Sequence, residues 1–394
     1  MNQRNLEHGK KPSKIRELFE IAKKRKEKYG IDNVYDFSIG NPSIPAPEIV
    51  YETLRDLIDK SSNEEVHFYT SNPGDLSVRN AIAEYLSKTY HTELKGDYIF
   101  MTCAAAAALS ISFNALLEKG DEVIVFAPFF PEYSILIEHT DAKTVIVKPD
   151  SKTFLPDFDD FKNKISPKTR IVVINSPSNP TGVVYKEDTL IKISEILKEK
   201  EKEFNHPIYL IADDPYRELI YDDIDFPIVT RYYDNSLICY SFSKSVSLPG
   251  ARIGYIAINP KAKDVEDIFF AICGASRALG YVCAPSLYQF MIPHILGKTS
   301  DLSIYKKNRD LLYSELKNIG YEMIYPDGAF YIFMKALEDD AEKFALNALD
   351  YNLVIVPSDS FGYKGYVRIA YCVKEEIINN SIPSFKKLYE RYQK

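Results

Sequence analysis

Cysteine is scarce in this sequence, with five in 394 residues. The cysteines form no C-x-x-C pair, and they form no cluster with histidine at the spacing of metal ligands. They are Cys103, Cys239, Cys273, Cys283 and Cys372. We therefore expect neither a disulfide framework nor a metal site. Isolated thiols in odd number are typical of a reducing compartment, so we expect a cytoplasmic protein.

Long hydrophobic runs are also missing. The N-terminus, MNQRNLEHGKKPSK, lacks the apolar stretch of a signal peptide. The most apolar segment, residues 101–117, contains Thr102, Ser110, Ser112 and Asn114, and it is shorter than the roughly 20 residues that a membrane span requires. We interpret this segment as a buried helix and expect no membrane partner.

Concentrated basic charge is absent except at one place. The net charge is −7, and the 49 basic residues are dispersed apart from a cluster at residues 23–28. A nucleic-acid surface would gather basic charge on one face, so we expect no nucleic-acid partner. The cluster lies within residues 13–29, where apolar side chains recur at helical spacing, and it is interpreted as the solvated face of an amphipathic helix.

The middle of the chain has the pattern of an α/β domain. Short β-rich runs alternate with amphipathic segments such as residues 189–200, which predicts a mainly parallel sheet covered by helices. The runs are residues 98–101, 122–127, 144–148, 170–175, 208–212, 237–241 and 253–258. Ligands gather beyond the carboxyl ends of such strands, so the residues after each run are the candidates for chemistry.

The pattern changes after about residue 296. A long polar helix is predicted over residues 303–318, followed by short strands near 330–334 and 366–371 and a terminal helix. This is typical of a smaller α+β domain completed by the N-terminal segment. The sequence therefore predicts a large domain over residues 48–296, and a small domain made of residues 1–47 and 297–394.

The strongest chemical signal is the segment SFSKSVSLPGARIG at residues 241–254. We expect its Lys244 and Arg252 to lie on a connecting loop at the carboxyl end of a strand. A shielded lysine amine can condense with an aldehyde, and an arginine with two serine hydroxyls can hold a phosphate. Taken alone, a lysine beside an arginine in a loop is more often a solvated surface pair.

Two further polar segments follow predicted strands. Asn179-Pro180-Thr181-Gly182 comes after the strand that ends at residue 175, and by itself it is equally typical of a turn. In Asp213-Asp214-Pro215-Tyr216, a carboxylate ends a buried run, where it needs a cation or a protonated ring nitrogen as partner. The alternative for Asp213 is a capping or turn residue.

Together, in this order, the three segments resemble the class I/II aminotransferases of the fold-type I enzymes that use pyridoxal 5′-phosphate (PLP). The resemblance covers about residues 35–390. It implies a mostly parallel seven-stranded sheet between helices, with a smaller α+β domain. It also implies that the protein moves an amino group between an L-amino acid and a 2-oxo acid through a Schiff base at Lys244.

The resemblance assigns roles to three catalytic residues. Lys244 would hold the cofactor and later carry the proton between the substrate Cα and the cofactor's C4′ carbon. Asp213 would keep the pyridine nitrogen protonated, which makes the ring an electron sink. Tyr216, together with Asn179, would donate to the phenolic oxygen of the ring.

Other residues would hold the cofactor by the same resemblance. Ser241, Ser243 and Arg252 would bind its phosphate, and Phe130 would stack on its ring. Tyr69 matches a tyrosine that reaches the phosphate in the neighbouring subunit, which implies a homodimer with shared active sites.

Substrate contacts follow from the C-terminal segment Gly365-Tyr-Val-Arg-Ile-Ala. Its Arg368 would pair with the substrate α-carboxylate, because a planar guanidinium fits a carboxylate and a buried arginine needs an anion. Asn179 would assist, and Gly40 would lie in the loop that closes over that carboxylate. Arg277 is near the place where some relatives hold acidic side chains, and a structural ion pair or a surface position is the alternative.

The sequence departs from the family at Ala104, Ala105 and Ala106. Many relatives have glycines followed by a polar residue there. We expect these alanines to contact the phosphate through main-chain N–H groups at a helix start, without the side-chain hydrogen bond.

Two other functions compete with transamination. A PLP-dependent carbon–sulfur β-lyase uses the same residues around the cofactor, and Arg368 does not separate the two chemistries. An aminotransferase-like regulator would carry an added DNA-binding domain, for which an N-terminal extension of about 30 residues is too short. We therefore expect an aminotransferase.

Overall fold

A seven-stranded sheet forms the centre of the larger part of the molecule. The computed structural model describes residues 1–10 and 13–393, and its main sheet has the order β2-β8-β7-β6-β5-β3-β4. The strands are β2 Ile99–Thr102, β3 Glu122–Phe126, β4 Lys143–Val147, β5 Thr169–Asn175, β6 Tyr209–Asp213, β7 Ser236–Ser241 and β8 Gly254–Ile258. Neighbours from β7 to β4 run parallel, and β8 is antiparallel to β7 and β2. The predicted mainly parallel sheet is confirmed.

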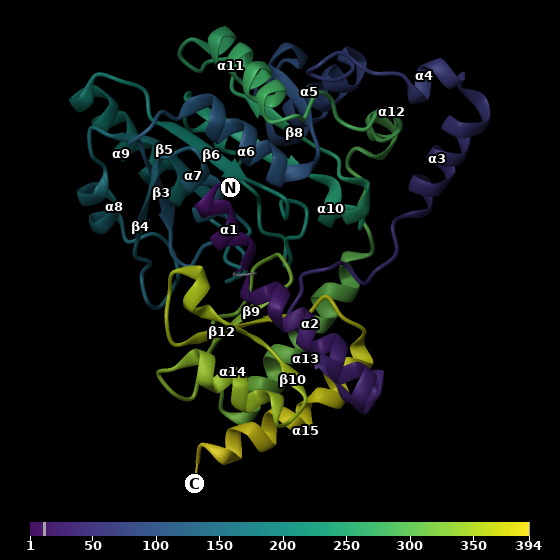
Figure 1. Ribbon diagram of the computed structural model, residues 1–394, viewed down its shortest axis with the longest axis vertical. Coiled ribbons are helices and arrows are strands. Elements are labelled where there is room, and N and C mark those ends of the chain that lie inside the picture. The colour runs from purple at the N-terminus through teal and green to yellow at the C-terminus, as the bar shows by residue number, and fades with distance from the viewer. Residues whose placement is uncertain (11–12, 394) are drawn as a thin grey trace.

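Helices cover both faces of this sheet because its strands are apolar on both sides (Figure 1). In β5, Val172 and Ile174 join the core on one face, whereas Ile171 and Val173 join the core on the other. The first core includes side chains of α5 Leu76–Tyr90, α8 Phe158–Lys164, α9 Glu187–Phe204 and α12 Ser286–Ile295. The second includes side chains of α6 Ala104–Leu116, α7 Glu132–His139 and α11 Val265–Ala278.

One predicted element needs correction. Residues 101–117 do not form a single helix, because Met101 and Thr102 end β2 and α6 begins at Ala104. The segment is apolar for two reasons: β2 is buried, and α6 packs between the sheet and α11. Within the residues described, no helix is long and apolar enough to cross a membrane.

A smaller α+β part lies below the main sheet in Figure 1. Its three-stranded sheet has the order β11-β12-β9, and β1 pairs in parallel with β10 beside it. The strands are β1 Tyr35–Asp36, β9 Tyr331–Lys335, β10 Leu353–Val354, β11 Val356–Pro357 and β12 Tyr366–Ala370. Its helices are α13 Leu302–Ile319, α14 Ala341–Leu349 and α15 Glu375–Arg391.

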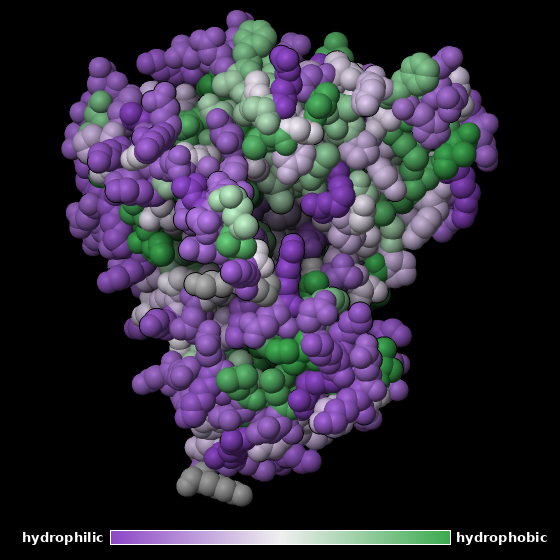
Figure 2. Space-filling model, in the orientation of Figure 1, coloured by the Kyte–Doolittle hydropathy of each residue, from purple (hydrophilic) through white to green (hydrophobic). Residues whose placement is uncertain are grey.

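The N-terminal helices contact both parts of the molecule. Helix α2 Lys14–Tyr29 buries Leu18 and Ala22 against Val354, as its amphipathic pattern predicts. Helix α1 Gln3–Lys10 instead reaches α7, where Arg4 donates to the Glu138 carbonyl at 2.7 Å. The remaining helices are α3 Glu48–Lys60, α4 Asn63–His67 and α10 Phe242–Ser245. On the face that carries α1 and α2, the surface is mostly hydrophilic, with hydrophobic side chains in separate patches (Figure 2).

Candidate active site

Three neighbouring strands bring the predicted polar segments together. In the register of the sheet, Asn175 at the end of β5 pairs with Asp213, and Asp213 pairs with Cys239 of β7. Lys244 follows β7 on the short helix α10, so the expectation that it lies on a loop is wrong. The helix forms because the Ser241 side chain accepts a hydrogen bond from the Ser243 N–H and caps it.

Asp213 has one satisfied and one unsatisfied oxygen. The Tyr133 hydroxyl of α7 donates to Oδ2 at 2.5 Å. Oδ1 is buried and has no hydrogen-bond partner in the described part of the chain. Burial raises the pKa of this carboxyl to about 7, against the lowering effect of Tyr133. An unpaired buried carboxylate oxygen fits a protonated ring nitrogen, so the residue suits the nitrogen of PLP.

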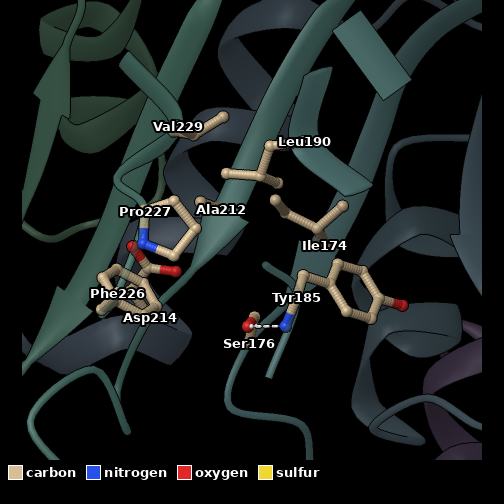
Figure 3. Close-up of a pocket in the computed structure, with 9 residues that line it drawn as sticks. All are labelled: Ile174, Ser176, Tyr185, Leu190, Ala212, Asp214, Phe226, Pro227 and Val229. Carbon is tan, nitrogen blue, oxygen red and sulfur yellow. Dashed lines mark hydrogen bonds between the residues drawn. The ribbon is translucent and has the colours of Figure 1, made fainter. Parts of the chain in front are cut away.

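Asp214 points away from this site. It lines a small pocket with Ala212 and Ile174, which Figure 3 shows together with Phe226 and Pro227. Successive residues of a strand point to opposite faces, and the packing of Ala212 and Ile174 places this pocket on the face opposite Tyr133. The pocket therefore does not belong to the site around Asp213.

Lys244 is a buried amine whose charge is disfavoured. Its Nζ donates to the Gly40 carbonyl at 2.7 Å, and no carboxylate lies within salt-bridge distance among residues 1–10 and 13–393. Burial lowers its pKa to about 8, helped by the positive charges of Arg368 and Arg252. A lysine that loses its proton at about pH 8, below the ordinary 10.5, is better suited to attack an aldehyde than an exposed lysine.

Arg368 is a buried cation that the protein does not neutralise. It is 1% exposed, and it donates to Asn179 Oδ1 at 3.0 Å and to the Ser38 carbonyl at 2.5 Å. Its Nε has no partner, and no carboxylate pairs with it among the described residues. Burial lowers its pKa. A buried guanidinium with polar but neutral neighbours fits a carboxylate ligand.

The polar residues form a connected set around the site. The Asn175 side chain donates to the Asp213 carbonyl and accepts from the Asn179 N–H, each at 2.7 Å. Asn179 contacts Arg368, whose guanidinium lies 4.6 Å from the centre of the Tyr331 ring. Tyr331 is hydrogen-bonded in turn to Tyr216, with the two hydroxyls 2.8 Å apart. These contacts place Asp213, Asn179, Tyr216 and Arg368 at one site.

The loop before α3 covers this site. The carbonyls of Ser38, Ile39 and Gly40 accept hydrogen bonds from Arg368, Cys372 and Lys244, respectively. Gly40 lies so close to β9 that an added Cβ would be 2.0 Å from the Tyr331 hydroxyl. Only glycine permits this approach, and the loop is therefore held against the two cations.

The predicted phosphate residues lie where β7 and β8 meet the start of α6. The Ser241 and Ser243 hydroxyls are 2.7 Å apart, and Ser241 pairs with Gly254. A Cβ on Gly254 would be 3.0 Å from the Ala104 Cα, so the helix start lies against β8. The helix has no side-chain cap, which leaves N–H groups at its first turn for a phosphate. That Ala104, Ala105 and Ala106 contact it remains a prediction.

Four predicted residues are not part of this connected set. Phe130 packs edge-to-face on Tyr133, with ring centres 5.7 Å apart, and so lies near the partner of Asp213. Arg252 and Arg277 are exposed within this chain. Tyr69 is 90% exposed.

Sequence reasoning missed Tyr133, Asn175, Ser38 and Tyr331 as parts of the site. Asn175 carried a usable signal, because it is a polar residue at the end of an apolar strand. Tyr133 and Tyr331 carried none, since a tyrosine in an apolar helix or strand is indistinguishable from core. Their positions depend on packing between distant segments.

Comparison with known sequences gives a consistent result. The profile of the family described as aminotransferase class I and II matches residues 32–383. The probable aspartate aminotransferase of Methanocaldococcus jannaschii is 29% identical, with 96% of this chain and 98% of that protein covered. The aspartate aminotransferase of Thermotoga maritima is 30% identical, with 89% and 90% covered.

Solved structures agree with the sequence comparison. An aminotransferase from Eubacterium rectale is 51% identical and superposes with a TM-score of 0.98, covering 100% of this chain and 99% of that one. The aspartate aminotransferase of Thermotoga maritima superposes with a TM-score of 0.86 at 29% identity, covering 98% and 99%. The fold-type I architecture expected from the sequence is confirmed.

Proposed function

Because this chain belongs to the class I and II aminotransferase family and is a PLP-dependent aminotransferase, we propose that Lys244 is the residue that bonds its cofactor. The observation that supports this most directly is the buried Lys244 amine, whose pKa is lowered to about 8. It lies near Arg368 and directly after β7, next to the strand that ends at Asp213. Such an amine is available as a nucleophile near neutral pH.

PLP, when bound, supplies an aldehyde and an electron-withdrawing ring that stabilises negative charge at the substrate Cα. Asp213 holds a proton on the ring nitrogen through its unpaired Oδ1. Tyr216 and Asn179 donate to the phenolic oxygen. The amine of Lys244 would carry the proton between the substrate Cα and the cofactor's C4′ carbon.

We assign cofactor binding and substrate binding to separate sets of residues. Ser241, Ser243, Arg252 and the main chain of Ala104–Ala106 hold the phosphate, and Phe130 stacks on the ring. Arg368 binds the substrate α-carboxylate through two N–H groups, with Asn179 beside it. The loop of Gly40 excludes water over that carboxylate.

The proposed substrates are an acidic L-amino acid such as aspartate and a 2-oxo acid. The support is that relatives covering nearly the whole chain are named aspartate aminotransferases. Arg277, exposed near the end of α11, is the candidate to hold the side-chain carboxylate of the substrate. With these substrates the enzyme would serve amino acid metabolism, in a biosynthetic process.

We propose a homodimer with shared sites. Tyr69 is a hydroxyl-bearing side chain that is 90% exposed, and Phe68 beside it is also exposed. The exposure of Tyr69 and of Arg252 within one chain is explained if each Tyr69 reaches the phosphate of the other subunit.

We also propose the domain boundaries and the location. The large domain spans residues 48–296, and the small domain combines 1–47 with 297–394, of which residues 11, 12 and 394 lie outside the described part. The two separate sheets support this division. The five cysteines are free thiols, which supports a cytoplasmic location.

The test is an assay of the purified holoenzyme with aspartate and 2-oxoglutarate. We expect glutamate to form, and we expect Arg277→Ala to lower kcat/KM for aspartate at least tenfold more than for alanine. Equal losses for both amino acids would contradict the role of Arg277. Pyruvate and ammonia from cystathionine, without glutamate, would indicate the lyase, which no comparison supports.

A further inference from the structure

Tyr331 has contacts that no role assigned so far explains. It lies in β9 of the smaller sheet and is 2% exposed. Its hydroxyl is hydrogen-bonded to that of Tyr216, and its ring lies under the Arg368 guanidinium. The same hydroxyl lies against Gly40 of the covering loop. One side chain therefore contacts the cofactor-side tyrosine, the carboxylate-binding arginine and the loop.

Other buried tyrosines of this chain show what a structural role looks like. Tyr321 donates its hydroxyl to the Phe385 carbonyl at 3.0 Å, and Tyr233 donates to the Ile208 carbonyl at 2.8 Å. Each satisfies its polar group with a main-chain oxygen, which is the usual solution for a buried hydroxyl. Tyr331 instead faces the hydroxyl of Tyr216, a residue with a role in the proposed function.

The donors and acceptors available to the Tyr216 hydroxyl determine whether Tyr331 donates a hydrogen bond to it or accepts one from it. A tyrosine hydroxyl has one proton to donate and accepts hydrogen bonds at its oxygen. If Tyr216 donates its proton to the phenolic oxygen of the cofactor, its own oxygen is available to Tyr331. Burial raises the pKa of Tyr331 to about 12, although Arg368 acts to lower it. Tyr331 therefore keeps its proton at working pH and can donate it.

Resting on the proposed function, we propose that Tyr331 is a positioning residue that donates to Tyr216, orients its hydroxyl and strengthens its hydrogen bond to the cofactor's phenolic oxygen. Each bond in such a chain polarises the next, and low local polarity increases the effect. Stronger donation by Tyr216 stabilises the phenolic anion. The proton held at Lys244 Nζ in the cofactor-loaded enzyme is then released at lower pH.

The experiment follows cofactor absorption against pH in the holoenzyme of Tyr331→Phe. This substitution removes one oxygen and keeps the ring under Arg368. We expect the apparent pKa of the absorption change to rise by about 0.5 unit, as suits the loss of one neutral hydrogen bond. In a Tyr216→Phe background we expect the same substitution to shift it by less than about 0.1 unit, because the acceptor is gone.

Tyr321→Phe is the matched control, since it removes a buried hydroxyl from the same hydrophobic core, that of the smaller part of the molecule. It should leave the titration unchanged, and its thermal unfolding should match that of Tyr331→Phe. A Tyr331→Phe shift no larger than the control's, or one that persists in the Tyr216→Phe background, overturns the proposal. If the cofactor absorption of the wild-type holoenzyme does not change with pH, the role proposed for Lys244 is wrong. The role proposed for Tyr331 depends on it and is then wrong as well.

Discussion

Two buried cations and one buried carboxyl define this site at the scale of single residues. Lys244 and Arg368 have no carboxylate partner within the described chain, and Asp213 leaves one oxygen unpaired. Unpaired buried groups of this kind reduce stability. All three are explained if bound ligands supply a ring nitrogen for Asp213, an aldehyde for Lys244 and a carboxylate for Arg368.

Asp213→Asn tests how much the buried carboxyl lowers the free energy of unfolding of the cofactor-free protein. Its pKa is about 7, above the ordinary value of 3.8, so the folded state binds more protons than the unfolded state between these values. The free energy of unfolding of the wild type should therefore fall as pH rises from about 4 to 7. Asparagine does not titrate, so the variant should be more stable than the wild type by up to about 4 kcal/mol at pH 8 and nearly equal at pH 4.

Denaturant unfolding at several pH values measures this difference. Asp339→Asn, at an exposed position, is the matched control and should show no such trend. In the holoenzyme Asp213→Asn should lower kcat by roughly 10²- to 10³-fold, because the ring nitrogen loses its ion partner. If the difference in free energy of unfolding between the variant and the wild type is the same at pH 8 as at pH 4, the buried carboxylate does not destabilise the folded protein.

Residues that end strands could be predicted from the sequence, whereas residues that contact them from other segments could not. Asp213 and Asn179 follow apolar runs, and the position after a strand is informative by itself. Tyr331 comes from another sheet, about 115 residues after Tyr216, and its contact depends on how the two sheets face each other. Local pattern carries no information on such a contact.

At the scale of elements, the strands were predictable because burial on both faces gives near-continuous apolar runs. All seven runs of the main sheet coincide with strands to within one residue at each end. Short elements were not predictable. Helix α10 is a single turn that depends on the Ser241 cap, and β10 and β11 are two residues each. Such pieces form from tertiary contacts, since isolated turns do not persist alone.

Gly40→Ala tests the covering loop. The added Cβ would overlap the Tyr331 hydroxyl, so the loop should move away from Lys244 and Arg368. We expect kcat/KM for the amino acid to fall by about 10- to 100-fold through misplacement of the carboxylate site. Steady-state kinetics with aspartate measures this.

Gly9→Ala is the control for the covering loop, because nothing lies within 4 Å of its added Cβ. It should leave kinetics unchanged. Thermal unfolding of both variants should stay close to wild type. Normal kinetics in Gly40→Ala would show that the loop does not close over the substrate.

At the scale of the whole molecule, the site belongs to two sheets at once. Asp213 and Lys244 come from the seven-stranded sheet and its connection, and Tyr331 and Arg368 come from the three-stranded sheet. Contacts elsewhere tie these parts together, including the ion pair of the buried Arg309 on α13 with Asp222, at 2.7 Å. Relative movement of the two parts would change the distance between the residues proposed to hold the cofactor, Asp213 and Lys244, and Arg368, which is proposed to bind the substrate carboxylate.

Hybrid dimers test whether the sites are shared. One chain carries Lys244→Ala and the other Tyr69→Ala, so each is inactive or weak alone. If Tyr69 serves the partner's cofactor, a mixed dimer has one site with both residues intact, and random mixing should restore about a quarter of wild-type activity. Co-refolded or co-expressed mixtures measure this.

The control for the hybrid pairs Lys244→Ala with a second inactive chain, Asp213→Asn. In the proposed site, Lys244 and Asp213 belong to the same chain, so this mixture has no intact site and should not recover activity. Recovery in both mixtures, or in neither, would contradict a shared site built with Tyr69.

The measurement that tests this account most directly is the absorption spectrum of purified protein incubated with PLP, before and after borohydride reduction. For the wild type we predict a cofactor band in the visible range, and after reduction and digestion a single labelled peptide that contains Lys244. Lys244→Ala should give neither, while Lys261→Ala at an exposed position should behave as wild type. A label at another lysine, or a band that survives in Lys244→Ala, would contradict the assignment on which the other roles depend.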